Sequence, residues 1–133
     1  MNPLIIEQSE FSPQVTLDPV NLKFQISGES RPENAGKFYE PIISWLEQYK
    51  SVLFWQKEKF GAPQKLDFIF KFEYFNSTSA KYILDLLKQI DLYHADGNEI
   101  RVQWYYDKLD EDMKDSGEEF SKLLNVPFDF IGQ

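Results

Sequence analysis

Apolar and polar residues alternate in four stretches of the chain, and this two-residue period predicts strands with one buried face. The alternating apolar positions are Val15 and Leu17; Leu22, Phe24 and Ile26; Leu66, Phe68, Phe70, Phe72 and Tyr74; and Ile100, Val102, Trp104 and Tyr106. The first two stretches flank a turn signal at Asp18–Asn21, so they predict an N-terminal hairpin whose second strand ends at Gly28. The third stretch is the longest and predicts a central strand.

Three other stretches carry apolar residues three or four positions apart, which predicts helices with one buried stripe. The stripes are Phe38, Ile42, Trp45, Leu46, Tyr49 and Leu53; Ile83, Leu87 and Ile90; and Leu109, Met113, Phe120 and Leu123. Either Ser30 or Asn34 is expected to cap the first helix. The second helix is expected to begin directly after Asn76 and Ser77. A short edge strand over 126–130 completes the chain.

The order strand–strand–helix–strand–helix–strand–helix, with a short final strand, predicts an α/β fold. Helices that connect parallel strands need right-handed crossovers, and the initial hairpin makes the sheet mixed. We expect a mixed β-sheet of four to five strands, covered by about three helices. The length of 133 residues fits one domain spanning 1–133.

The charge and the cysteine content exclude several classes of partner. With 22 acidic against 14 basic residues the chain carries a net charge of −8, which opposes binding to nucleic acid and to anionic membranes. It contains no cysteine, so neither a disulfide framework nor a thiolate metal site is expected. The N-terminus lacks the features of a signal peptide, and no apolar run is long enough to span a bilayer. A cytoplasmic protein is the simplest interpretation.

Three consecutive hydroxyl residues occupy 77–79, at the start of the predicted second helix. A serine nucleophile needs a nearby base, but the single histidine, His94, lies a helix length from Ser77, roughly 20 Å away. A phosphate-binding loop needs glycines, and none occurs between Phe72 and Asp96. The sequence therefore predicts no catalytic residue, no cofactor site and no metal site.

Two interpretations of the hydroxyl residues remain open. Asn and Ser are good helix caps, so capping explains one of these residues. It does not explain three together, because Ser and Thr are poorer helix formers than Ala or Glu. A covalent phosphate at a helix N-terminus is favoured by the helix dipole, and it adds a charge of about −1.5 to −2 that can control binding.

Three motifs occur in a characteristic order along the chain: SRPEN at 30–34, YFNSTSAK at 74–81 and WYYD at 104–107. Their combination resembles the SiaC family of regulatory phosphoproteins over nearly the whole chain, from about residue 15 to residue 128. These are small bacterial proteins with a fold like the sulfate-transporter and anti-sigma-antagonist (STAS) domain. The resemblance implies a non-enzymatic switch with a dedicated kinase and phosphatase. In that family the unphosphorylated form binds and activates a diguanylate cyclase and so controls cyclic di-GMP and biofilm formation.

The resemblance also implies roles for individual residues. The family phosphorylates the hydroxyl after the motif's asparagine, which is Ser77 here, and Thr78 is the alternative because the family usually has Thr followed by two serines. The implied partner-binding residues are Glu33, Asn34, Asn76, Thr78, Ser79 and Lys81. An alternative function on the same fold is an antagonist of an anti-sigma factor in a partner-switching stress pathway. The sequence leaves open the partner's identity, the oligomeric state and which phosphorylation state is active.

Overall fold

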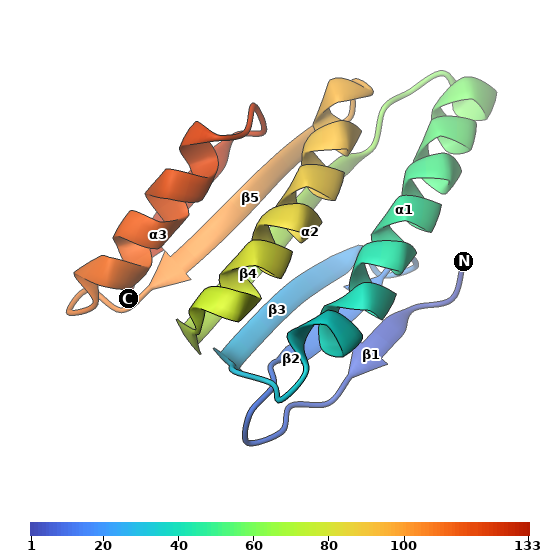
Figure 1. Ribbon diagram of the computed structural model, residues 1–133. Helices are drawn as coiled ribbons and strands as arrows, with labels where there is room; N and C mark the ends of the chain where they lie inside the picture. The colour runs from blue at the N-terminus through green and yellow to red at the C-terminus, as the bar shows by residue number, and fades with distance from the viewer.

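The computed structural model describes residues 1–133 and contains one six-stranded sheet and three helices (Figure 1). The elements are β1 (Leu4–Ile6), β2 (Gln14–Asp18), β3 (Lys23–Ser30), α1 (Ala35–Phe60), β4 (Lys65–Phe75), α2 (Ser77–Ala95), β5 (Glu99–Tyr106), α3 (Glu111–Lys122) and β6 (Phe128–Gly132). The strands lie side by side in the order in which they occur along the chain. The predicted α/β class is therefore confirmed, with six strands instead of four to five.

The additional strand is β1, at one edge of the sheet. It pairs antiparallel with β2, where Leu4 lies opposite Leu17. The indole of Trp45 in α1 holds the chain just before it, by donating to the carbonyl oxygen of Asn2 at 2.9 Å. Three consecutive apolar residues show no alternation, so the sequence offered no strand signal here. Pairing with a preformed neighbour, not local pattern, makes this segment a strand.

The predicted hairpin of β2 and β3 is confirmed, but β3 continues beyond Gly28 to Ser30. The register between β3 and β4 shifts at Gly28 and Glu29, and Gly28 adopts a φ of +108°. This left-handed backbone is readily accessible only to glycine. Gly28 therefore does not end the strand as predicted. It forms an irregularity inside β3, and the strand continues to Ser30, next to the start of α2.

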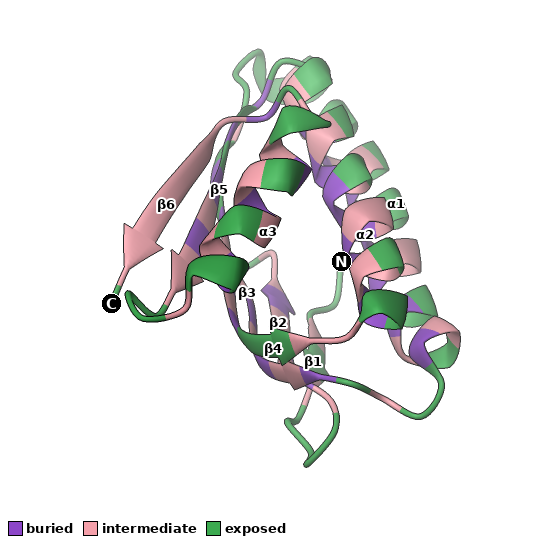
Figure 2. Ribbon diagram, turned by 60° about the vertical axis from the view of Figure 1, so that its left-hand side comes forward, coloured by how far each residue is buried: buried purple, intermediate pink, exposed green.

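All three helices pack on the same face of the sheet (Figure 2). Strands β3 to β6 are parallel, and each is joined by a helix to its immediate neighbour, so crossovers of one hand place every helix on one side. The expectation that helices cover the sheet is right for one face only. The opposite face is polar, with side chains such as Gln25, Ser27, Lys71 and Gln103 on it, while the buried face carries the hydrophobic core.

The core contains 26 buried residues, and aromatic rings dominate its centre. Phe70 and Phe72 of β4 lie against Trp104 of β5, with ring centroids 5.9 and 6.0 Å apart. Helix α3 closes over Trp104 at Gly117, where an added Cβ would lie 2.5 Å from the indole. Only glycine permits this approach of helix to ring.

The helix limits refine the sequence prediction. Asn34, not Ser30, caps α1, because the Asn34 side chain accepts a hydrogen bond from the backbone N–H of Lys37 at 3.0 Å. Two residues of the expected third stripe, Leu109 and Leu123, lie outside α3 and are 94% and 66% exposed. None of the three helices combines the length and the apolar character needed to cross a membrane.

Candidate functional site

The three hydroxyl residues at the start of α2 differ in their exposure to solvent. Asn76 caps the helix, because its side-chain oxygen accepts a hydrogen bond from the backbone N–H of Ser79 at 2.9 Å. Ser77 and Thr78 occupy the first two helical positions and are exposed, whereas Ser79 is fully buried. Capping therefore explains Asn76 and leaves the exposed hydroxyls of Ser77 and Thr78 without a structural role.

Ser79 belongs to a buried network that joins three elements. Its hydroxyl donates to the carbonyl oxygen of Ser30 at 3.1 Å and accepts from the Ser30 hydroxyl at 3.0 Å. Because the Ser30 proton is used in this way, the Tyr39 hydroxyl donates to Ser30 Oγ at 2.5 Å. The backbone N–H of Asn76 also donates to the Ser30 carbonyl. The network ties the end of β3 to the first turns of α1 and α2, and burial raises the pKa of Tyr39 to about 12.

This network corrects the expectation that Ser79 contacts a partner. A residue with no exposed surface and a fully used hydroxyl cannot touch a docked protein without local unfolding. The buried position of Ser30 likewise explains why it is not a helix cap. The sequence could not show this, because Ser30 and Ser79 are 49 positions apart.

A groove runs between the first turns of α1 and α2. It is lined by Glu33, Asn34, Ala35, Gly36, Lys37, Phe38, Thr78 and Tyr82. Gly36 allows the helices to approach, since a Cβ there would lie 2.9 Å from the Tyr82 hydroxyl. The structure thus brings Glu33, Asn34 and Thr78 together, as expected for one surface, while Ser77 is not among the residues that line the groove.

The electrostatics of this region differ from the acidic character of the whole chain. Neither α1 nor α2 has an acidic residue in its first turn, and the N-terminal ends of both helices carry partial positive charge. Lys37 and Lys81 are exposed, and neither takes part in a salt bridge. A phosphate placed on Ser77 or Thr78 would lie at the free N–H groups of the α2 N-terminus, where the helix dipole favours an anion.

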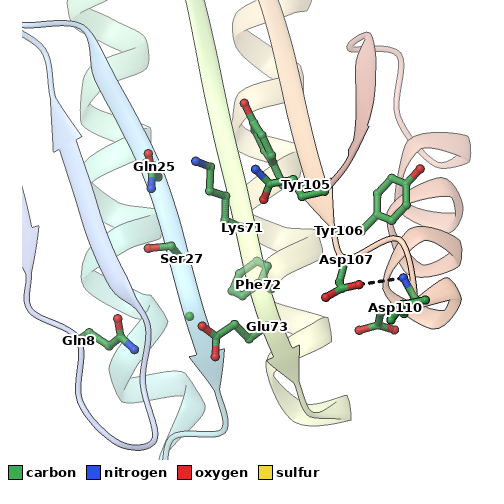
Figure 3. Close-up of a pocket in the computed structure, with 13 residues that line it drawn as sticks. Gln8, Gln25, Ser27, Lys71, Phe72, Glu73, Tyr105, Tyr106, Asp107 and Asp110 are labelled. Atoms are coloured by element: carbon green, nitrogen blue, oxygen red, sulfur yellow. Dashed lines mark hydrogen bonds between the residues drawn. The ribbon is translucent and has the colours of Figure 1, made fainter.

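A second hollow lies on the face of the sheet that no helix covers (Figure 3). Its lining comes from β3, β4 and β5 and from segments next to the strands, and the ammonium group of Lys71 lies 4.5 Å from the ring centroid of Tyr105. Two of its carboxylates already bind backbone N–H groups: Asp107 accepts from Leu109 and Asp110 from Met113. The hollow offers polar contacts, but its residues do not pair a nucleophile with a base. The only histidine of the chain, His94, lies in the last turn of α2.

Comparison with known proteins shows which family this chain resembles over nearly its whole length. Residues 6–133 match the family model described as "SiaC family regulatory phosphoprotein". An uncharacterised protein of Pseudomonas aeruginosa (strain UCBPP-PA14) is 24% identical over 128 residues, covering 96% of this chain and 94% of that protein.

Two crystal structures from Pseudomonas aeruginosa share the fold, each with a TM-score of 0.83, 23% identity and coverage of 98% of this chain and 99% of theirs. One is apo-SiaC, and the other is the diguanylate cyclase SiaD in complex with its activator SiaC. The match to the family model extends over nearly the entire chain. This protein is therefore a member of the SiaC family of regulatory phosphoproteins.

Proposed function

We propose that this chain is a non-enzymatic cytoplasmic phosphoprotein whose unphosphorylated form binds and activates a diguanylate cyclase. Membership of the SiaC family supports a regulatory role, and SiaC of Pseudomonas aeruginosa is described as the activator of the diguanylate cyclase SiaD. The observation that carries the proposal is the exposed pair Ser77 and Thr78, which begins a capped helix beside a groove.

Ser77 is the proposed phosphoacceptor. It is exposed, it directly follows Asn76, and its position at the first turn of α2 suits an anion. Thr78 is the alternative, and its side chain faces the groove instead. Burial removes Ser79 from consideration. A cognate kinase must add the phosphate and a phosphatase must remove it, so both are implied partners.

The proposed switch acts on binding. The surface for the effector comprises the exposed residues Glu33, Asn34, Thr78 and Lys81 around the two helix starts, with Asn76 at its edge. Phosphorylation at Ser77 adds a charge of about −1.5 to −2 and three strongly hydrated oxygens at this surface. A partner surface that packs closely on this edge of the helices would then have to bury that charge. Affinity for the cyclase falls, and the cyclase loses its activator.

The test compares Ser77→Ala with Thr78→Ala. Each variant is incubated with the cognate kinase and Mg-ATP, its mass is measured, and its ability to stimulate synthesis of cyclic di-GMP by the cyclase is assayed. We expect Thr78→Ala to gain one phosphate and lose activation, as the unsubstituted chain does. Ser77→Ala should gain none and should stay activating after kinase treatment. Both variants should fold, because Asn76 still caps the helix.

Different outcomes of this experiment test the acceptor residue, the switch and the effector separately. Phosphorylation of Ser77→Ala but not of Thr78→Ala would move the acceptor to Thr78. Phosphorylation of the double variant Ser77→Ala/Thr78→Ala, with activation lost, would refute a switch at these hydroxyls. Tight binding to an anti-sigma factor without any effect on a cyclase would replace the effector by the alternative partner class.

A further inference from the structure

Three large aromatic side chains in the C-terminal half of α1 are exposed. Phe54 and Trp55 are 56% and 57% exposed, and Phe60 at the end of the helix is 67% exposed. Trp55 lies in a row of residues four positions apart, Glu47, Ser51, Trp55 and Lys59, all of which are exposed. Such rows form the ridges by which helices pack against one another. We call this row the α1 ridge.

The α1 ridge is complementary to itself. Its ends carry opposite charges, Glu47 and Lys59, and its middle pairs a small residue, Ser51, with a large one, Trp55. If two copies pack antiparallel about a two-fold axis beside position 53, each Glu47 lies opposite the Lys59 of the other copy. In the same arrangement each Trp55 lies over the Ser51 of the other copy, where there is room for an indole.

We propose that two copies of this chain form a two-fold dimer through the α1 ridge. A two-fold interface needs a patch that complements itself, and the ridge meets this condition in both charge and volume. Neither Glu47 nor Lys59 takes part in a salt bridge within the chain, so both are free to pair across the axis. Lys59 already lies beside the aromatic patch, with its ammonium group 4.6 Å from the Trp55 ring centroid and 5.6 Å from that of Phe60.

The size of the patch sets the expected affinity. A large aromatic side chain buries about 150–250 Å² when it is fully covered, and Trp55, the aromatic residue of the ridge, is 57% exposed. Together with Glu47, Ser51 and Lys59 it supplies much less area than the roughly 800 Å² per partner of a standard interface. We expect a weak, reversible dimer with a dissociation constant of about 10–100 µM.

The dimer leaves the phosphorylation site free. Helices α1 and α2 run in the same direction, because each connects two parallel strands. Their C-terminal ends are tied together where the Lys57 ammonium donates to the carbonyl oxygen of Asp96 at 2.7 Å. The aromatic end of the ridge thus lies at the opposite end of the helix layer from Ser77, toward the top of Figure 1. The dimer presents two separate switch sites, and its formation does not depend on phosphorylation.

Analytical ultracentrifugation of the full chain over about 10 µM to 1 mM tests the dimer. We expect a monomer–dimer equilibrium for the unsubstituted chain. Glu47→Lys and Lys59→Glu should each weaken it by about tenfold or more, because each places two pairs of like charges across the axis. The double variant Glu47→Lys/Lys59→Glu restores opposite charges and should return the dissociation constant to within about threefold of the original.

Two further variants complete the test. Trp55→Ser should weaken the dimer by about 30-fold or more, as loss of a central aromatic side chain does at interfaces. Glu119→Lys, an exposed charge reversal on α3, is the matched control and should leave the dimer unchanged. A monomer at all concentrations, a double variant no better than the single ones, or a dimer insensitive to Trp55→Ser would each overturn the proposal. Circular dichroism melting confirms that every variant is folded.

Discussion

At the scale of single residues, three adjacent hydroxyls have different surroundings. Ser79 joins β3, α1 and α2 from a fully buried position, and Ser77, two positions earlier, faces solvent. The difference follows from helix geometry, because residues two positions apart point about 200° apart around the helix axis. The same polar side chain is thus structural at one position and available for modification at the other.

Alanine substitutions should distinguish these two positions in stability. Ser79→Ala leaves the buried Ser30 hydroxyl without its acceptor, so we expect the free energy of unfolding to fall by about 1–3 kcal/mol. Ser77→Ala removes an exposed hydroxyl and should change it by no more than about 0.5 kcal/mol. Urea denaturation followed by circular dichroism measures both values. Equal losses in the two variants would contradict the assigned buried network.

At the scale of elements, β4 is the strand on which the core is built. It lies between β3 and β5, and its alternate residues face the helices on one side and solvent on the other. Phe70 and Phe72 are 2% and 5% exposed, whereas Ile69 lies on the open face and is partly exposed. Neighbouring positions of one strand therefore make unequal contributions to stability.

Truncation of this strand tests the assignment of its faces. Phe70→Ala and Phe72→Ala should each destabilise the fold by about 3–5 kcal/mol, since each leaves a cavity beside Trp104. Ile69→Ala is the matched control from the opposite face, and we expect it to cost less than about 1.5 kcal/mol. Thermal and urea denaturation give the comparison. If Ile69→Ala were the most damaging of the three, the buried face would be the wrong one.

At the scale of the whole molecule, buried tyrosines join the helices to one another and pack against the aromatic rings of the sheet. Tyr39, Tyr49 and Tyr93 are each 2% exposed or less, and the Tyr93 hydroxyl donates to the carbonyl oxygen of Leu46 at 2.5 Å. Burial raises the pKa of Tyr39 and of Tyr49 to about 12 and moves that of Tyr93 higher still. The neutral phenol is the form that the fold accommodates.

This arrangement predicts loss of stability at alkaline pH. A folded-state pKa above the ordinary value of 10.0 means that the folded chain holds the proton more tightly than the unfolded chain does. The stabilisation is complete below about pH 10 and disappears as the pH rises through about 12. Urea denaturation from pH 7 to 12 should show this decline, and Tyr49→Phe should make it less steep. A stability that stays constant to pH 12 would contradict the prediction.

The sequence by itself determined which residues form the main elements and which of their faces is buried. The alternation in β4 as far as Phe72 and in β5, and the helical stripes of α1 and α2, appear in the structure as predicted, because a residue's side of a strand or helix depends only on local geometry. Beyond Phe72 the predicted alternation of β4 is wrong, because Tyr74 is 49% exposed and Phe75 instead packs against Trp104 in the core. The cap at Asn76 could also be predicted, since it depends only on neighbours within one turn. The motifs around 30–34 and 74–81 were sufficient for the family.

Tertiary structure decided everything that depends on residues far apart in the chain. Only pairing with β2 makes a strand of the short β1, and only the adjacent order of β3 to β6 places all helices on one face. Ser79 is buried because β3 brings Ser30 beneath the start of α2, and the α1 ridge is exposed because no later element packs against it. The physical reason is common to these cases: a local pattern shows which face of an element is apolar, but the neighbour that covers that face comes from elsewhere in the chain, or from another molecule.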